Sequence, residues 1–196
     1  MTTVACIVIA TERRRALVEK RVLPSVINQG FDEVVLVADW QIREADQGVY
    51  RHACVEPFQR TTNDALVRRD VGTLMTKADV LVYLCDDHIL GPDFLATLRE
   101  VIDEEWDVVV PNRWVDHDSV GPVQLNNGER DGYCGGHAGV FRRALIESRP
   151  WSAHSLSREW DARISFSQRL AGARFVWHPR AGIAIEDIEP GAEPWR

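Results

Sequence analysis

A continuous apolar segment, residues 80–84, runs almost directly into two adjacent aspartates, Asp86 and Asp87. An unbroken apolar run of this length predicts a strand that is buried on both faces of a mostly parallel sheet. In open α/β sheets, ligands bind beyond the carboxyl ends of the strands, so both carboxylates would lie at a binding edge. Pro92 then indicates the start of a helix, because the apolar residues after it recur at helical spacing.

Two interpretations explain why Asp86 and Asp87 stand next to each other. They repel each other and lose hydration on burial unless a positive charge joins them. A divalent cation with oxygen ligands is one natural partner. The local alternative is an acidic turn that caps the following helix, because aspartate is favoured at such junctions. The pair by itself leaves both interpretations open.

The rest of the first half predicts strands and helices in alternation. Residues 4–10 and 31–38 are apolar and rich in β-branched side chains, which favours two more buried strands, and residues 50–55 favour a short one. Helical patterns at 13–29 and 61–76 connect these strands. This order predicts an α/β fold with a doubly wound, mostly parallel sheet, helices on both faces and right-handed crossovers.

Several polar or small residues stand out within these elements. Asp39 ends the second strand, where a carboxylate can accept hydrogen bonds from a ribose or a base, or can cap a turn. The three consecutive arginines at 13–15 form either a solvated helix face or a cluster that faces phosphate. Gly72 lies inside a predicted helix, where glycine costs roughly 1 kcal/mol relative to alanine, and it therefore indicates close packing against a neighbour.

The second half is less regular. A strand at 106–110 is followed by a long polar segment, 113–132, of a length that is usually functional or mobile in a compact domain. Glycines and a histidine then precede a strand and a helix, and glycine there lets a ligand approach the backbone. Another helix is predicted to begin at residue 159. A late strand at 174–178 ends before Pro179, and the tail beyond it has little periodicity.

Charge and cysteine content exclude several classes of protein. The 30 acidic residues outnumber the 23 lysines and arginines, which argues against nonspecific binding to nucleic acid or to an anionic membrane. The four cysteines lack paired C-x-x-C spacing, so we expect reduced thiols in or near the core of a cytoplasmic protein. The first apolar run does not have the form of a signal peptide, and no run could span a bilayer, so no membrane partner is predicted.

Taken in order, these motifs resemble the nucleotide-sugar-dependent glycosyltransferases of the GT-A fold, a Rossmann-related architecture, and in particular the family-2-like group. The resemblance covers most of the chain and is carried by VACIVIAT, VVLVADW, RDVG, YLCDDHILGPDFL, YCGGHAGVFRRALIE and EWDARISFSQRLAGARFVWHP. It implies one small catalytic domain, 1–196, with a nucleotide-binding half at 1–110 and an acceptor-side half at 111–196, and without the membrane-associated extension of many relatives.

The resemblance also implies roles for individual residues. The nucleotide-binding residues would be Thr11, Arg13, Asp39, Arg69 and Asp86. The metal, Mn²⁺ or Mg²⁺, would be held by Asp87 as principal ligand, with Asp86 and His88. The catalytic base of an inverting reaction would be Asp161, with Glu159 as second choice, and the acceptor-side residues would be Gly135, Gly136 and His137. The donor would be a UDP- or GDP-linked sugar.

Three features depart from the family pattern. His88 stands where a third carboxylate is often found, Trp160 separates the two acids of the catalytic pair, and residues 182–187 lack the histidine that many relatives carry after the late strand. The acceptor could be a glycan, a small molecule or a nucleic-acid base, of which the acidic charge disfavours the last. Self-association into a homo-oligomer is compatible with the sequence.

Two other functions use a similar set of residues. A Mg²⁺-dependent nucleotidyltransferase has a related sheet, but it usually needs a glycine-rich loop after the first strand, and IATERRR contains no glycine. A noncatalytic protein that binds nucleotide sugars or carbohydrates would keep the fold without turnover. Asp161 separates such a binding protein from a transferase, because its replacement by asparagine would abolish turnover only in an enzyme.

Overall fold

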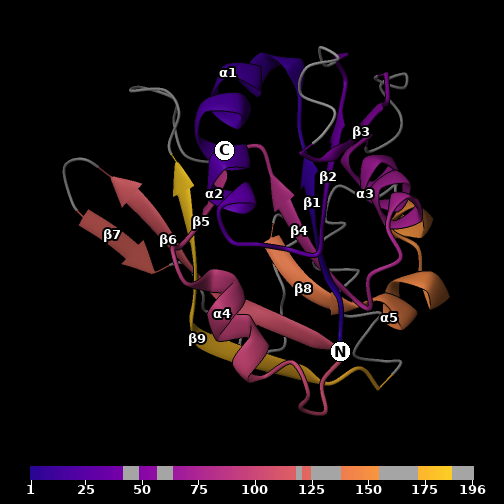
Figure 1. Ribbon diagram of the computed structural model, residues 1–196, viewed down its shortest axis with the longest axis vertical. Helices are drawn as coiled ribbons and strands as arrows, with labels where there is room; N and C mark the ends of the chain where they lie inside the picture. Colours follow the sequence, from indigo (N-terminus) through magenta and orange to yellow (C-terminus); the bar gives the residue numbers. More distant parts are fainter. Residues whose placement is uncertain (42–48, 57–63, 118–120, 125–137, 155–171, 187–196) are drawn as a thin grey trace.

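The computed structural model describes residues 1–41, 49–56, 64–117, 121–124, 138–154 and 172–186 (Figure 1). Within these residues one nine-stranded sheet has the order β3-β2-β1-β4-β8-β6-β9-β5, and β7 pairs with β6. The strands are β1 (Val4–Ile9), β2 (Glu33–Ala38), β3 (Arg51–Cys54), β4 (Val80–Cys85), β5 (His88–Leu90), β6 (Val108–His117), β7 (Gly121–Gln124), β8 (Ala138–Arg142) and β9 (Phe175–Glu186).

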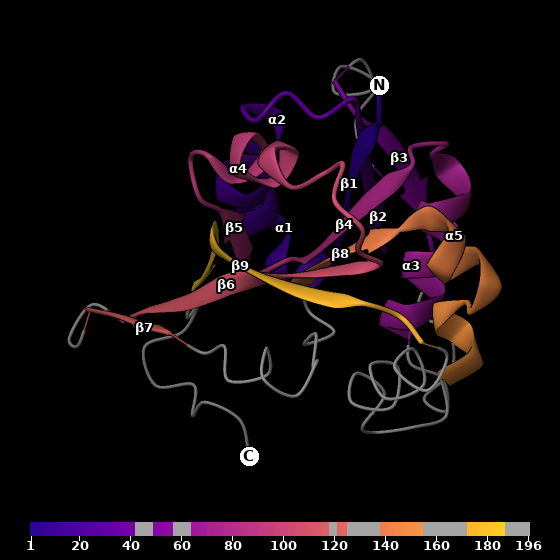
Figure 2. The same ribbon diagram turned by 90° about the horizontal axis from the view of Figure 1, so that it is seen from below.

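The helices cover both faces of this sheet, as Figure 2 shows. They are α1 (Arg15–Leu17), α2 (Leu23–Ile27), α3 (Asp64–Met75), α4 (Phe94–Glu100) and α5 (Arg143–Ser148). A π-helical stretch, Val18–Val22, joins α1 to α2, and 3₁₀ turns occupy Glu12–Arg14 and Trp151–His154. None of the helices in the described part of the chain has the length and apolar character that crossing a bilayer requires.

Alternating side chains of the central strands build two cores. Val80, Val82 and Leu84 of β4 pack in the core beneath α2 and α4, whereas Leu81 and Tyr83 point to the core beneath α3 and α5. Both sets are almost fully buried. The apolar run at 80–84 is therefore a strand covered on both faces, as the sequence predicted.

The first half of the sheet confirms the predicted parallel arrangement. β1 pairs in parallel with both β2 and β4, and β2 pairs in parallel with β3. Six of the nine described strands share one direction, since β6 and β9 also run parallel to each other, while β5, β7 and β8 run the opposite way. The fold is thus a mostly parallel α/β sheet with an antiparallel component in its second half.

Two strands of the second half, β6 and β9, are longer than the sequence predicted, and two short strands, β5 and β7, were missed. β6 continues through Pro111 to His117 and pairs with β7, so part of the expected loop 113–132 is a hairpin. β9 continues past Pro179, because the pairing of β6 with β9 moves from Pro111↔His178 to Asn112↔Gly182. This irregularity leaves Pro179 without a partner in the ladder, which is where a strand tolerates proline. β5, which directly follows the acid pair, was not predicted at all.

Candidate functional site

Polar residues meet where three neighbouring parallel strands end. β1 lies between β2 and β4, so the residues after their carboxyl ends share one edge of the sheet. Thr11 follows β1 by two residues, Asp39 directly follows β2, and Asp86 directly follows β4. The sequence placed these three residues at a common binding edge, and the structure brings them together there.

Asp86 links the end of β4 to the turn after β1 by hydrogen bonds. Its Oδ2 accepts hydrogen bonds from the backbone N–H of Thr11 (3.0 Å) and from the Thr11 hydroxyl (2.7 Å). Its Oδ1 accepts a hydrogen bond from Arg14 Nη1 at 2.9 Å. Both carboxylate oxygens of this buried residue are therefore engaged, and they face the β1 turn.

Asp87 lies between a guanidinium and an imidazole. Its Oδ2 is 2.6 Å from Arg14 Nη1, and its Oδ1 is 2.6 Å from His88 Nδ1. Burial acts to raise the pKa of Asp87, but the hydrogen bonds and charges of His88 and Arg14 outweigh it and hold this pKa well below its ordinary value. Since an ionised carboxylate only accepts hydrogen bonds, His88 Nδ1 carries the hydrogen in this pair.

The lowered pKa of Asp87 predicts how folding stability depends on pH. Because the folded-state pKa lies below the unfolded value of about 3.9, the contribution of this carboxylate is complete at neutral pH and is lost as the pH falls below about 4. Urea unfolding of the wild type and of Asp87→Asn between pH 7 and pH 3 measures this contribution. We expect the difference in unfolding free energy to shrink at the acidic end. A constant difference would contradict the predicted ion pairing.

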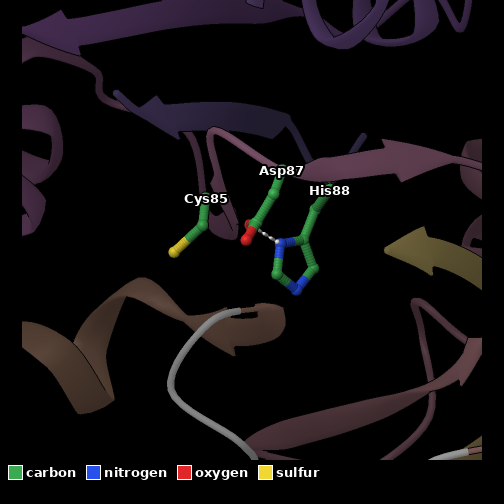
Figure 3. A group of neighbouring side chains, drawn as sticks. All are labelled: Cys85, Asp87 and His88. Carbon is green, nitrogen blue, oxygen red and sulfur yellow. Dashed lines mark hydrogen bonds and ion pairs between the residues drawn. The ribbon is translucent and has the colours of Figure 1, made fainter. Parts of the chain in front are cut away.

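Cys85 lies close to Asp87 and His88, and the three residues form one group of candidate metal ligands. The candidate ligand atoms of Cys85, Asp87 and His88 all lie within 4.8 Å of one another. Figure 3 shows their side chains extending to the same side of the turn between β4 and β5. Burial raises the pKa of the Cys85 thiol to about 11, although the nearby Arg69 acts against this. The sequence predicted Cys85 only as a thiol in or near the core. Its position directly before the acid pair is the signal that could have identified it as a candidate metal ligand.

These three donors define how well the site fits a divalent cation. Asp87 and His88 are two of the predicted metal ligands and lie together, whereas Asp86 is directed at Thr11 and Arg14. The group of oxygen, nitrogen and sulfur donors suits a transition metal. Mg²⁺ fits less well, because it prefers an octahedral shell made of oxygen ligands.

Asp39 is held by the helix that covers it and by the β1 turn. Its Oδ1 accepts a hydrogen bond from the backbone N–H of Glu12, and Arg68 Nη2 lies 3.3 Å from its Oδ2. Arg68 also donates from Nη1 to the carbonyl of Ala10 at 3.0 Å. A buried arginine of α3 therefore links the ends of β1 and β2.

The predicted nucleotide-binding arginines lie beside the residues that make these contacts. Arg13 is exposed, and Arg14 is the residue that reaches the acid pair. Arg69 is fully buried, with Nη2 3.4 Å from Cys85 Sγ and its guanidinium 5.4 Å from the centre of the Trp151 ring. Arg69 therefore contacts the site through Cys85, whereas Arg68 contacts Asp39.

Some predicted site residues fall outside the described part of the chain. These are Gly135, Gly136 and His137 on the acceptor side, and the two candidate bases, Glu159 and Asp161. The arginines that follow the glycine-rich segment are described. Arg143 donates to the carbonyls of Thr76 and Ala78, near the amino end of β4 and away from the acid pair.

The sheet order and the polar residues at its carboxyl edge define an α/β fold of the GT-A type, as predicted from the sequence. Solved structures with this fold include S. aureus TarS residues 1–349, with a TM-score of 0.70 and 16% identity over 95% of this chain. The same protein solved in complex with UDP-GlcNAc matches 100% of this chain at 15% identity and a TM-score of 0.69. Its complex with UDP matches 97% of this chain at 16% identity and a TM-score of 0.70.

These matches establish the fold and not the activity of this chain. The chain spans 60–62% of the TarS 1–349 structures and 37% of a structure of TarS described without residue limits. No protein-family model and no curated protein matches the sequence.

Proposed function

We propose that this chain is a metal-dependent glycosyltransferase that moves a sugar from a UDP- or GDP-linked donor to a hydroxyl acceptor. The observation that carries the proposal is the meeting of Thr11, Asp39 and the Asp86–Asp87 pair at the carboxyl edge of β1, β2 and β4. The likeness in fold to TarS, which has been solved with UDP-GlcNAc and with UDP, supports a nucleotide-sugar donor.

The donor half of the site combines acceptors for the nucleoside with positive charge for the diphosphate. Asp39 would accept hydrogen bonds from the ribose or the base, and Thr11 and Asp86 would shape the turn beneath the diphosphate. Arg13 and Arg69 are also proposed to bind the donor, because each lies next to an arginine that contacts Asp39 or the acid pair. We add Arg14, because its guanidinium already lies at both acids and can turn toward a phosphate oxygen with the same charge complementarity.

The resemblance implies Mn²⁺ or Mg²⁺, held by Asp87 and His88 with Asp86 in support, and the nitrogen and sulfur donors beside Asp87 favour the transition metal of the two. When bound, it would act as a Lewis acid on the diphosphate as negative charge develops there. Arg14 would remain close enough to share in neutralising the leaving group, because both acids already hold it. The low pKa of Asp87 keeps its carboxylate ionised and able to bind a cation throughout the physiological pH range.

The acceptor half would supply the base. Asp161 would take the proton of the acceptor hydroxyl on the face of the sugar opposite the diphosphate, which gives inversion, and Glu159 is the second candidate. Gly135, Gly136 and His137 would line the acceptor side. Asp161→Asn is expected to bind the donor with unchanged affinity while losing turnover, as measured by calorimetry and by product formation. Full turnover would exclude Asp161 as the base.

The test of the whole proposal is nucleotide release from a panel of UDP- and GDP-linked sugars. Each donor is incubated with the protein and Mn²⁺, Mg²⁺ or a chelator, and the released UDP or GDP is measured. We expect slow hydrolysis or saturable binding of one donor, lost with the chelator. Failure of every donor to bind with either metal present would overturn the proposed function.

A further inference from the structure

Cys85, Asp87 and His88 offer three different donor atoms within one turn of the chain. We propose that this cluster binds a thiophilic divalent ion of the Zn²⁺ or Co²⁺ class, with Cys85 as a thiolate ligand, and that it selects against Mg²⁺. The sequence resemblance predicted a carboxylate-centred site, and it did not include a sulfur ligand. The proposal concerns the chemistry of the ion and one additional ligand.

The spacing of the donor atoms supports a common ion. Ligand atoms at 2.0–2.3 Å from one tetrahedral ion lie roughly 3.3–3.8 Å apart. The three atoms here lie within 4.8 Å of one another, so a movement of about 1 Å would bring the most distant pair into range. The cluster spans the end of β4 and the start of β5, and both strands are paired in the sheet, so the backbone holds the donors close together.

The donors are also sheltered and surrounded by suitable charges. His88 is 2% exposed and Asp87 is 8% exposed, whereas Cys85 is half-buried. Arg69 Nη2 lies 3.4 Å from Cys85 Sγ, so a positive charge already faces the sulfur that metal binding would make anionic. Arg14 lies on the other side, at Asp87 Oδ2, whereas Oδ1 accepts the hydrogen that His88 Nδ1 donates. An ion bound by both residues would replace that hydrogen, and the proton would be released to solvent.

This set of donors predicts the preference for one ion over another. Thiolate and imidazole ligands favour Zn²⁺ and other late first-row ions, whereas Mg²⁺ takes oxygen ligands and loses its water reluctantly. Three protein ligands also leave one tetrahedral position open, as in catalytic zinc sites. A diphosphate oxygen would fill that position, and this last step alone rests on the proposed function.

Cobalt absorption spectroscopy tests the thiolate directly, without any need for activity. Co²⁺ is added to the reduced wild-type protein, and we expect a thiolate-to-cobalt charge-transfer band in the near ultraviolet that Zn²⁺ abolishes and millimolar Mg²⁺ leaves unchanged. Cys85→Ser should lose the band and bind Co²⁺ at least about tenfold more weakly. Cys54→Ser is the matched control, because it removes another partly buried free cysteine and should keep the band.

The outcomes separate this inference from the proposed function. No band in the wild type, or a band that survives Cys85→Ser and disappears in Cys54→Ser or Cys134→Ser, overturns the assignment of Cys85. The wild-type measurement needs no variant, so misfolding of Cys85→Ser cannot rescue the proposal. A cobalt band without binding of any nucleotide sugar supports the metal site and refutes the proposed donor. Donor hydrolysis with Mg²⁺ and no cobalt band supports the proposed function and overturns the thiolate metal site.

Discussion

Asp87→Asn is expected to reduce metal-dependent nucleotide release by a factor on the order of 10²–10³, and to abolish saturable metal binding at the site. The carboxylate is the only charged oxygen donor in the Cys85–Asp87–His88 cluster, and asparagine keeps its shape while removing its charge. Arg14 would lose one of its two ion pairs and remain bound to Asp86. The variant therefore removes the cation's anchor with little change in volume.

The measurement compares nucleotide release and Mn²⁺ or Co²⁺ affinity in Asp87→Asn and Asp79→Asn. Asp79 precedes the opposite, amino end of β4, where it is exposed and accepts hydrogen bonds from Thr3, so it provides a matched loss of one charge outside the site. Asp79→Asn should keep both properties. If Asp87→Asn released nucleotide as the wild type does, with the same dependence on metal, the acid pair could not be the cation site.

The parallel strands β1 to β4 were predictable because their signal is local. A continuous β-branched run such as residues 4–10 can be satisfied only by burial on both faces, and β1 is buried along its whole length. The limits of β6 and β9 were not predictable, because each continues through a proline that usually ends a strand. Pairing between these two distant segments accommodates the prolines at a register shift, and no local pattern encodes that pairing.

The sequence identified the segments that form the site more reliably than the individual side chains that make its contacts. Strand ends locate Thr11, Asp39 and the acid pair, because each follows an apolar run that the sequence makes visible. On a helix, however, neighbouring side chains point roughly 100–120° apart, so a motif can identify the correct turn while the adjacent arginine makes the contact that is seen. Arg14 contacts the acids beside the expected Arg13, and Arg68 contacts Asp39 beside the expected Arg69.

Gly72→Ala is expected to destabilise the protein by about 2 kcal/mol, although alanine is the better helix former by roughly 1 kcal/mol. A Cβ at this position would overlap Cγ2 of Ile7 and lie 3.3 Å from Cγ2 of Val37. Both neighbours are fully buried in β1 and β2, which are paired on both sides, so neither can move away at low cost. The overlap therefore outweighs the gain in helix propensity.

Urea unfolding of a double-mutant cycle with Ile7→Ala tests this explanation. Ile7→Ala removes the overlapping methyl group, so Gly72→Ala should become nearly neutral in that background, with an interaction energy of about 2 kcal/mol between the sites. Gly30→Ala is the contrasting control, because Gly30 has a φ of 77° and a methyl group added there would meet nothing within 4 Å. Its cost of about 1 kcal/mol comes from the left-handed backbone, and it should be the same with or without Ile7. Equal costs of Gly72→Ala in both backgrounds would contradict the overlap with Ile7 as the cause, and with it the inference that close contact between α3 and β1 brings Arg68 and Arg69 to the site.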